Sequence, residues 1–327
     1  MVVILYPLQN QNTMTFRDVT VMEIISPYVL LAVTMAACLF AYLLKNLYSK
    51  KYQKKASDPY MFSAVTSVIS AATVAAVSGG IGSVSKTTLI FALVYGIDCA
   101  VQTVALALAL QTGPLSYSSV IVSLSTVIPA FSGWVFWNEK MTALRLVGIL
   151  LMIACFVFSV KKEEEGKKAQ KQWYIHAALS FLTTGLCGVI QKMYGKTAVS
   201  GETAGFVVTA FAFSTLVSLI MFAVFKLKER KIAHNGHDRD ETVKKAKSNC
   251  IIPAAVLVAT GICVGLNNQI NLYLAGIMDS AFFFPVVNGG NLLLVTLFSV
   301  TVFGERPSLR QWIGLALGCA SVVMLCL

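Results

Sequence analysis

The chain has 327 residues, of which 57% are hydrophobic and 13% are charged, and its formal net charge is +11. Soluble proteins carry roughly 25% charged residues, so the composition excludes a water-facing surface over the whole chain. The positive charge does not indicate a nucleic-acid partner, because the Lys and Arg residues lie in short stretches between apolar segments and no basic stripe is interleaved with aromatic residues. We therefore expect a multi-pass integral membrane protein that has the lipid bilayer as its first partner.

Residues 1–23 are expected to form an N-terminal tail, because Arg17, Asp18 and Glu23 lie there. The tail lacks the order of basic, apolar and small residues that defines a signal peptide. The eight cysteines of the chain lie mostly in apolar runs and form no Cys-x-x-Cys pair. We interpret them as small core residues, and the sequence indicates no disulfide framework and no metal site.

Ten apolar stretches follow the tail, and each meets or approaches the length of about 20 residues that a helix needs to cross the hydrocarbon core. Continuous apolar runs such as Leu146–Val160 favour helices over the alternating strands of a barrel. We therefore predict an all-α integral membrane fold with ten transmembrane helices. The predicted spans are 24–47, 59–78, 88–110, 114–137, 142–160, 173–194, 204–225, 250–274, 279–303 and 308–327.

An internal repeat relates the two ends of this series. The segment FWNEK at 136–140 has a Gly nine residues after its Glu, and so has FGER at 303–306, with the two Glu residues 305 − 139 = 166 positions apart. The segment LKNLYSK at 44–50 similarly parallels IQKMYGK at 190–196, with 190 − 44 = 146. The longer offset is explained by an inserted charged loop at 226–249 in the second copy.

The repeat predicts the domain organisation. Residues 24–160 form a first five-helix repeat, 161–172 a charged linker, and 173–327 a second five-helix repeat. Because five is odd, the second copy enters the membrane from the opposite side, which makes the repeats inverted. Inverted repeats place a binding site near the midplane and allow alternating access.

The ten spans and the two joints, from Glu139 to Gly148 and from Glu305 to Gly314, resemble the drug/metabolite transporter superfamily and in particular its EamA-like members. The resemblance covers nearly the whole chain from about residue 24. It implies a carrier for amino acids, metabolites, sugar derivatives or toxic compounds, often driven by protons, and leaves the substrate open. We interpret Glu139 and Glu305 as structural, since a carboxylate at a helix joint can satisfy the free amides at the start of the next helix.

Asp98 is the deepest acidic residue in the predicted spans, and Gln102 follows it one helical turn later on the same face. A charged group at mid-bilayer costs about 2.5–3.5 kcal/mol on insertion scales and usually faces a cavity. Two interpretations stay open: a carboxylate that couples transport to protons, and a protonated Asp that only tethers helices.

Further polar residues in the second half point to a substrate pathway. Four amides within five positions of the eighth span must either line a wet cavity or join helices. Proline and glycine in the ninth span predict an interrupted helix, with a packing kink as the alternative. Near the ends of their spans, Lys45 and Lys192 are expected to extend to the membrane interface. The candidate pathway consists of Asp98, Gln102, Gln191, Asn267, Asn268, Gln269, Asn271, Asn288 and Asn291.

The predicted function is a secondary transporter in the cell membrane that moves a small-molecule substrate without a cofactor. An intramembrane enzyme for lipid-linked substrates is the alternative, although the sequence has no GxSxG or HExxH motif. A non-transporting membrane partner is a third option. GxxxG patterns at Gly261/Gly265 and Gly314/Gly318 suit either internal packing or a homodimer.

Orientation stays open. Of the 26 Lys and Arg residues, six lie in the even-numbered loops and the termini, so 26 − 6 = 20 lie in the odd-numbered loops. The positive-inside rule then places both termini outside, whereas the resemblance implies termini in the cytoplasm.

Overall fold

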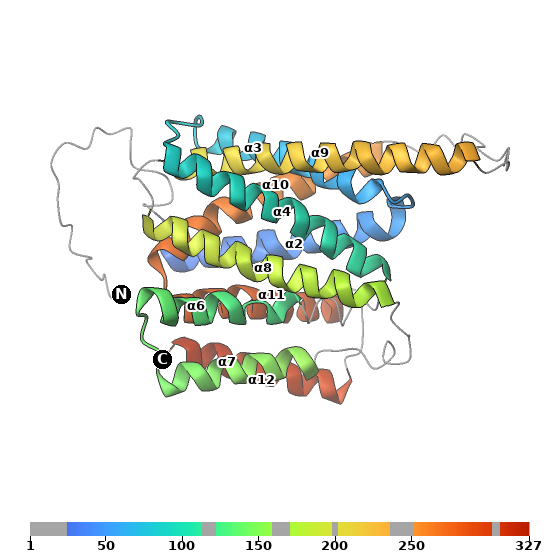
Figure 1. Cartoon of the computed structure of the whole chain (residues 1–327). Helices are drawn as coiled ribbons and strands as arrows, with labels where there is room; N and C mark the ends of the chain where they lie inside the picture. Colours follow the sequence, from blue (N-terminus) through green and yellow to red (C-terminus); the bar gives the residue numbers. More distant parts are fainter. Residues whose placement is uncertain are drawn as a thin grey trace.

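The structure is a computed structural model that describes residues 25–112, 122–158, 171–197, 202–235, 251–302 and 308–326. Within these residues every regular element is a helix (Figure 1). The helices are α2 (Pro27–Tyr52), α3 (Asp58–Val77), α4 (Lys86–Thr112), α6 (Val127–Trp137), α7 (Ala143–Phe158), α8 (Lys171–Thr197), α9 (Thr203–Asn235), α10 (Ile251–Ile277), α11 (Ser280–Val302) and α12 (Leu309–Cys326).

Six of these helices are long and apolar enough to cross a membrane, namely α2, α3, α4, α8, α9 and α10. Shorter apolar helices occupy Val122–Trp137, Ala143–Phe158 and Leu309–Leu325. Large apolar side chains such as Ile90, Leu150 and Ile220 are more than half exposed, as a lipid-facing surface requires. The prediction of an all-α, multi-pass membrane protein is confirmed.

A helix overlaps each of the ten predicted spans, and most bounds agree to within a few residues. At the C-terminal ends the largest difference is α9, which was expected to end near residue 225 and continues to Asn235. Residues 226–231 are Lys, Leu, Lys, Glu, Arg and Lys, all good helix formers, so the helix does not stop where the apolar residues stop. Figure 1 shows this charged end of α9 extending beyond its neighbours.

The prediction of an interrupted ninth span is wrong. Helix α11 is continuous through Pro285, and a side chain on Gly289 or Gly290 would collide with Met152 of α7 or Met35 of α2. The glycines therefore allow close packing of α11 against its neighbours. The break occurs instead in the fourth span, where a turn at Ser125–Thr126 precedes α6.

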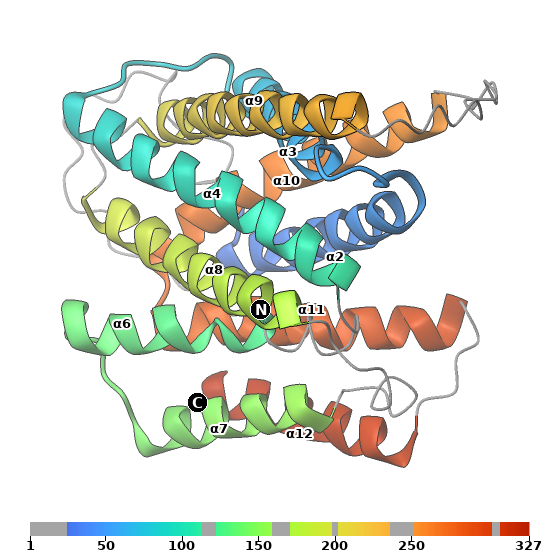
Figure 2. The same cartoon turned by 45° about the vertical axis from the view of Figure 1, so that its right-hand side comes forward.

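The helices form layers (Figures 1 and 2). Helices α3 and α9 lie together at one edge of the bundle and α7 and α12 at the other, with α6 and α11 beside the latter pair. Between these edges, α4 packs on α8 and α2 packs on α10. Hydroxyl pairs join α3 to α9, with Oγ–Oγ distances of 2.8 Å for Ser63–Ser218 and 3.0 Å for Ser67–Ser214.

Both GxxxG patterns are used inside the chain. Gly261 and Gly265 of α10 lie against Ile69 and Ser70 of α3. On the other side of the bundle, α12 approaches α7 closely through Gly314 and Gly318, which face Phe158 and Cys155. The joint residue Gly148 makes the reciprocal contact from α7 to Leu325, and its carbonyl accepts a hydrogen bond of 2.6 Å from Ser321 Oγ. Gly148 and Gly314 thus hold α7 and α12 together.

Replacement of Gly265 by Val is expected to destabilise the fold by about 1–3 kcal/mol, because an added Cβ would lie 2.8 Å from the carbonyl oxygen of Ser70. Thermal unfolding of the purified protein measures the change. Ile262→Leu is the matched control, since Ile262 is on the same helix and 40% exposed. Equal unfolding temperatures for the two variants would contradict this account of the α3–α10 contact.

The start of α9 is tied to the loop before α4 by Glu202. Its Oε2 accepts hydrogen bonds from Ser85 N at 3.1 Å, from Ser85 Oγ at 2.8 Å and from Thr88 Oγ1. The hydrogen bonds from Thr88 and Ser85 lower the pKa of the Glu202 carboxyl below its ordinary value of 4.5. The ionised form of Glu202 is thus favoured in the folded state.

A lowered pKa in the folded state contributes stability that is present above pH 4.5 and is lost as the pH falls through the folded-state value. We expect Glu202→Gln to lower the unfolding temperature at pH 7 and the difference from the unmodified protein to shrink as the pH falls below 4.5. Thermal unfolding measured from about pH 3.5 to about pH 8, on both sides of the ordinary carboxyl pKa of 4.5, tests this. A difference independent of pH would contradict the assignment.

Candidate functional site

A ladder of polar contacts runs along the interface between α4 and α8. From one end to the other, the heavy-atom distances are 3.1 Å for Thr88–Tyr194, 2.7 Å for Tyr95–Gln191, 2.8 Å for Asp98–Cys187, 3.3 Å for Gln102–Thr184 and 3.4 Å for Thr112–His176. Residue numbers rise on α4 as they fall on α8, so the helices are antiparallel. The contacts extend over most of both helices. We call this row the α4–α8 ladder.

Helix α10 joins the ladder at Tyr95. The Tyr95 hydroxyl donates to Asn268 Oδ1 at 2.5 Å and accepts from Gln191 Nε2 at 2.7 Å, and Gln191 Nε2 lies 3.4 Å from the same Asn268 oxygen. Two predicted pathway residues, Gln191 and Asn268, are thereby brought together from different helices. Sequence analysis missed Tyr95. The sequence feature that could have identified Tyr95 is its position one helical turn before Asp98, on the same face of α4.

Asp98 lies near the middle of α4, with 6% of its surface exposed. Its Oδ2 accepts a hydrogen bond from Cys187 Sγ at 2.8 Å, and the Cys187 sulfur lies 4.0 Å from that of Cys99. The carboxyl is therefore buried between two helices that the predicted repeat assigns to different halves. A thiol is a weak donor, so Asp98 has no strong hydrogen-bond donor among the contacts of the described residues.

Asn267 and Asn271 join α10 to α2. Asn267 Nδ2 donates to Thr34 Oγ1 at 2.9 Å and to Thr34 O at 3.1 Å, and Thr34 Oγ1 donates to Asn271 Oδ1 at 2.9 Å. Asn271 Nδ2 in turn donates to Asn267 Oδ1 at 3.1 Å. Thr34 is completely buried. These two amides therefore connect helices, while Asn268, which points away from them, belongs to the α4–α8 ladder.

The remaining predicted pathway residues are not hydrogen-bonded to this group. Asn288 donates to the carbonyl of Phe284 in its own helix at 3.1 Å. Gln269 is 6% exposed, and its Oε1, like the Oδ1 of Asn291, has no hydrogen-bond partner among the described residues. Asn288 and Asn291 lie on α11, which packs on α6, α12 and α2.

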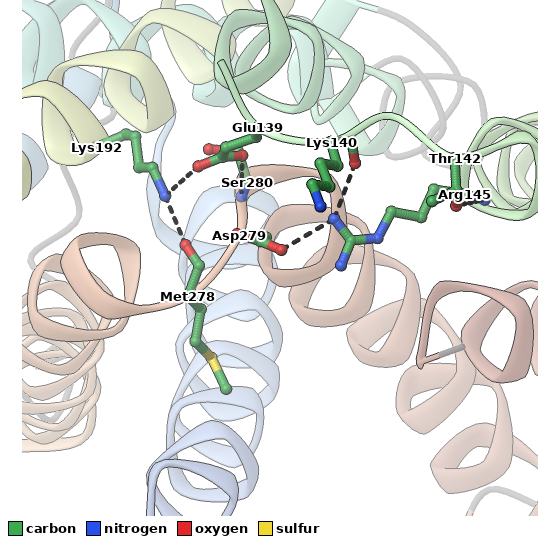
Figure 3. Close-up of polar contacts among 8 residues, drawn as sticks. All are labelled: Glu139, Lys140, Thr142, Arg145, Lys192, Met278, Asp279 and Ser280. Carbon is green, nitrogen blue, oxygen red and sulfur yellow. Dashed lines mark hydrogen bonds and ion pairs between the residues drawn. The ribbon is translucent and has the colours of Figure 1, made fainter. Parts of the chain in front are cut away.

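The joint residue Glu139 occupies a second polar centre (Figure 3). Its Oε1 lies 2.6 Å from Lys192 Nζ, and its Oε2 accepts a hydrogen bond of 2.8 Å from the backbone N of Ser280, the first residue of α11. Lys192 also donates to the carbonyl of Met278 at 2.5 Å. Asn138, directly before Glu139, has φ 55° in the left-handed region and ends α6.

This centre corrects one sequence-based expectation and refines another. The side chain of Lys192 does not reach solvent at the end of its helix: it is completely buried, and Glu139 compensates its charge. Glu139 does satisfy a helix N-terminus, but that of α11 and not that of α7, the next helix in the chain. Its repeat counterpart Glu305 lies outside the described residues.

A second ion pair lies beside the first. Arg145 Nη1 of α7 is 2.9 Å from Asp279 Oδ2 in the turn between α10 and α11, and it donates to Lys140 O at 3.1 Å (Figure 3). The side chains of Arg145 and Asp279 are 20% and 49% exposed, so solvent screens this pair. Among the described residues, no group of three or more His, Cys, Asp or Glu side chains is arranged to hold a metal ion.

Comparison with known proteins gives a family match over part of the chain. Residues 26–161 match the EamA-like transporter family. The resemblance stated from the sequence is confirmed for this part of the chain, and the EamA-like family is part of the drug/metabolite transporter superfamily. The matched range contains α2, α3, α4, α6 and α7, with Asp98 and Glu139. EamA-like proteins are membrane transporters, not enzymes.

A solved crystal structure has the same fold. It superposes on the chain with a TM-score of 0.68 and 17% sequence identity, covering 91% of this chain and 96% of the other. At this identity the likeness concerns the fold alone, and it extends beyond the EamA-like match into the second half. No curated protein sequence matches the chain.

Tyr95→Phe tests the junction of α4, α8 and α10. Loss of the hydroxyl removes the donor to Asn268 and the acceptor of Gln191, and a buried polar group without its partner costs about 1–3 kcal/mol. We expect a lower unfolding temperature than in the control Tyr28→Phe, where the ring is 70% exposed. Unchanged thermal unfolding of Tyr95→Phe would show that the junction does not hold the helices together.

Proposed function

We propose that this protein is a secondary transporter that moves a small metabolite, amino acid or drug-like molecule across the cell membrane by alternating access. The observation that carries the proposal is the α4–α8 ladder, which places a carboxyl, two amides and a tyrosine hydroxyl deep in an apolar helix bundle. Polar side chains at this depth are expensive unless a substrate or ion uses them. The EamA-like match gives the same class of activity.

The proposal includes the ten-helix inverted repeat. Under the predicted correspondence, α2, α3, α4, α6 and α7 match α8, α9, α10, α11 and α12. The packing partners follow this correspondence. Helix α2 packs on α10, and its counterpart α8 packs on α4, the counterpart of α10. Helix α3 likewise packs on α10, and its counterpart α9 packs on α4. Three further pairs of helices in contact, α3–α9, α6–α11 and α7–α12, each consist of two counterparts. This exchange is what a twofold axis between the halves would produce, and it supports two bundles that can rock about the ladder.

Asp98 is the group we propose for proton coupling. It is buried, it lies on the interface between the halves, and its hydrogen-bond donor is a thiol. Movement of α8 relative to α4 would change the surroundings of the carboxyl and thereby its affinity for a proton. Gln102 and Gln191, one turn to either side of the Asp98–Cys187 contact, would supply polar groups to the substrate.

Reconstitution in liposomes tests the proposal. The protein is expected to accumulate one of a panel of amino acids, amines or sugar derivatives when a pH gradient is imposed, and not when a protonophore collapses the gradient. Absence of movement for every compound in both directions would oppose a carrier.

Asp98→Asn separates coupling from transport. The variant keeps the size of the side chain but cannot release a proton, so gradient-driven accumulation should be lost while exchange of labelled for unlabelled substrate continues. The two assays, run on the same vesicles, are each other's control. Full accumulation by the variant would remove Asp98 from the coupling mechanism, and loss of both activities would assign it to binding or folding.

A further inference from the structure

The two ion pairs lie on one end of the bundle. We call this end the joint face; it carries the turn 138–142 between α6 and α7 and the turn 278–279 between α10 and α11, and the turn 53–57 between α2 and α3 lies on the opposite face (Figures 1 and 2). The contact of Glu202 with Ser85 and Thr88, between the start of α9 and the loop before α4, also lies on the joint face.

Glu139 connects the two halves of the chain at the joint face. It belongs to the first half, while its two partners, Lys192 of α8 and the first amide of α11, belong to the second. Lys192 also donates to the carbonyl of Met278, within the second half. The fit is close, since a Cβ on Gly133 would lie 2.2 Å from Glu139 Oε2 and 2.7 Å from Ser280 Cβ. Separation of the halves on this face would break both contacts of Glu139, to Lys192 and to the Ser280 amide (Figure 3).

The burial of Lys192 makes the loss of either partner costly. Its side chain is completely buried, and that of Glu139 is 9% exposed. A buried pair is strongly destabilised when one partner is removed, because the other charge is left uncompensated. Opening of the face is one way to relieve this cost, because water then reaches the remaining charge.

The opposite face cannot form the same ion pair. The repeat offset of 146 places Asn46 where the second half has Lys192, since 192 − 146 = 46. Asparagine carries no charge, and Asn46 Oδ1 is buried without a hydrogen-bond partner among the described residues. The two faces of the repeat therefore differ at the position that closes the joint face.

We propose that the ion pair between Lys192 and Glu139 is a latch that holds the joint face closed and biases the resting carrier toward access from the opposite face. The inference rests on the alternating-access function proposed above. It adds a specific energetic difference between the two states: opening on the joint face must break a buried ion pair. On the opposite face the counterpart of Lys192 is the uncharged Asn46, and among the described residues the contact between the halves there is Ser57 donating to Glu229.

The exposed pair of Arg145 and Asp279 provides a matched control. It joins the same two halves on the same face, but the Asp279 side chain is 49% exposed. Exposed ion pairs contribute little. Asp279→Asn is therefore expected to leave the closed face unchanged.

The native thiols beside Asp98 report on the state of the joint face. Cys99 and Cys187 are part-buried within the α4–α8 ladder, so a water-soluble maleimide reaches them only through an open face. Vesicles of both orientations, with labelling of each cysteine quantified by peptide mass spectrometry, give the rate from each side. Cys319 is exposed on α12, where the surface faces lipid, so a water-soluble maleimide should not label it and it serves as the negative control.

The variant Lys192→Asn carries the residue that the first half has at the corresponding position, Asn46. In this variant the rate of labelling of Cys99 and Cys187 from the joint face is expected to rise by roughly tenfold or more. The rates in the unmodified protein and in Asp279→Asn are the references. The double variant Lys192→Met/Glu139→Gln has no uncompensated charge, which preserves folding, and should show the same direction of change. Size-exclusion chromatography verifies that each variant is folded.

An unchanged rate in either folded variant, or an equal rise from both faces, would overturn the latch. The labelling needs no substrate, so its outcome is separate from that of the transport assay. Increased labelling from the joint face alone, without transport of any compound, would support the latch and oppose the carrier function. Transport by a protein whose labelling is unchanged in the variants would support the carrier function and oppose the latch.

Discussion

The hydrocarbon interior of a membrane offers no hydrogen-bond partner, so polar side chains inside the bundle must find partners within the protein, in their own helix or on another. This constraint explains how the helices are joined. Serine pairs connect α3 to α9, Thr34 and two asparagines connect α2 to α10, and the α4–α8 ladder runs along a third interface. Apolar packing between helices is no more favourable than packing against lipid tails, so polar contacts and small residues determine which helices meet.

The α4–α8 ladder and the centre around Glu139 meet this constraint in different ways. Along the ladder the contacts are mostly between neutral groups, each of modest energy, and Asp98 has only a thiol as donor. Such contacts can be exchanged for contacts with a substrate. Around Glu139, two opposite charges are buried together with a helix N-terminus. The first arrangement is suited to binding and release, and the second to holding two parts of the chain in one position.

The sequence predicted helix positions well, because apolar length is read directly from residue type. It also brought out Asp98 and the amide-rich stretch of α10. What it could not predict was partner choice: nothing in the spacing of Asn267, Asn268 and Asn271 says that two of them meet Thr34 while the third meets Tyr95. The same limit applies to Lys192, whose burial depends on Glu139, a residue 53 positions away in sequence (192 − 139 = 53). The interrupted ninth span was wrong because the glycines are used for packing against Met152 and Met35.

The left-handed backbone of Asn138 accounts for part of the joint pattern itself. A residue with φ near 55° turns the chain sharply at the end of α6 and directs the following carboxylate toward α11. Asparagine and glycine tolerate this conformation far better than other residues do, and glycine is the residue that stands before the second Glu, at position 304. The requirement at this joint is therefore stereochemical as well as chemical: a residue type that permits the turn, followed by an acid. A β-branched residue before Glu139 would be incompatible with that geometry, however well the acid itself were retained.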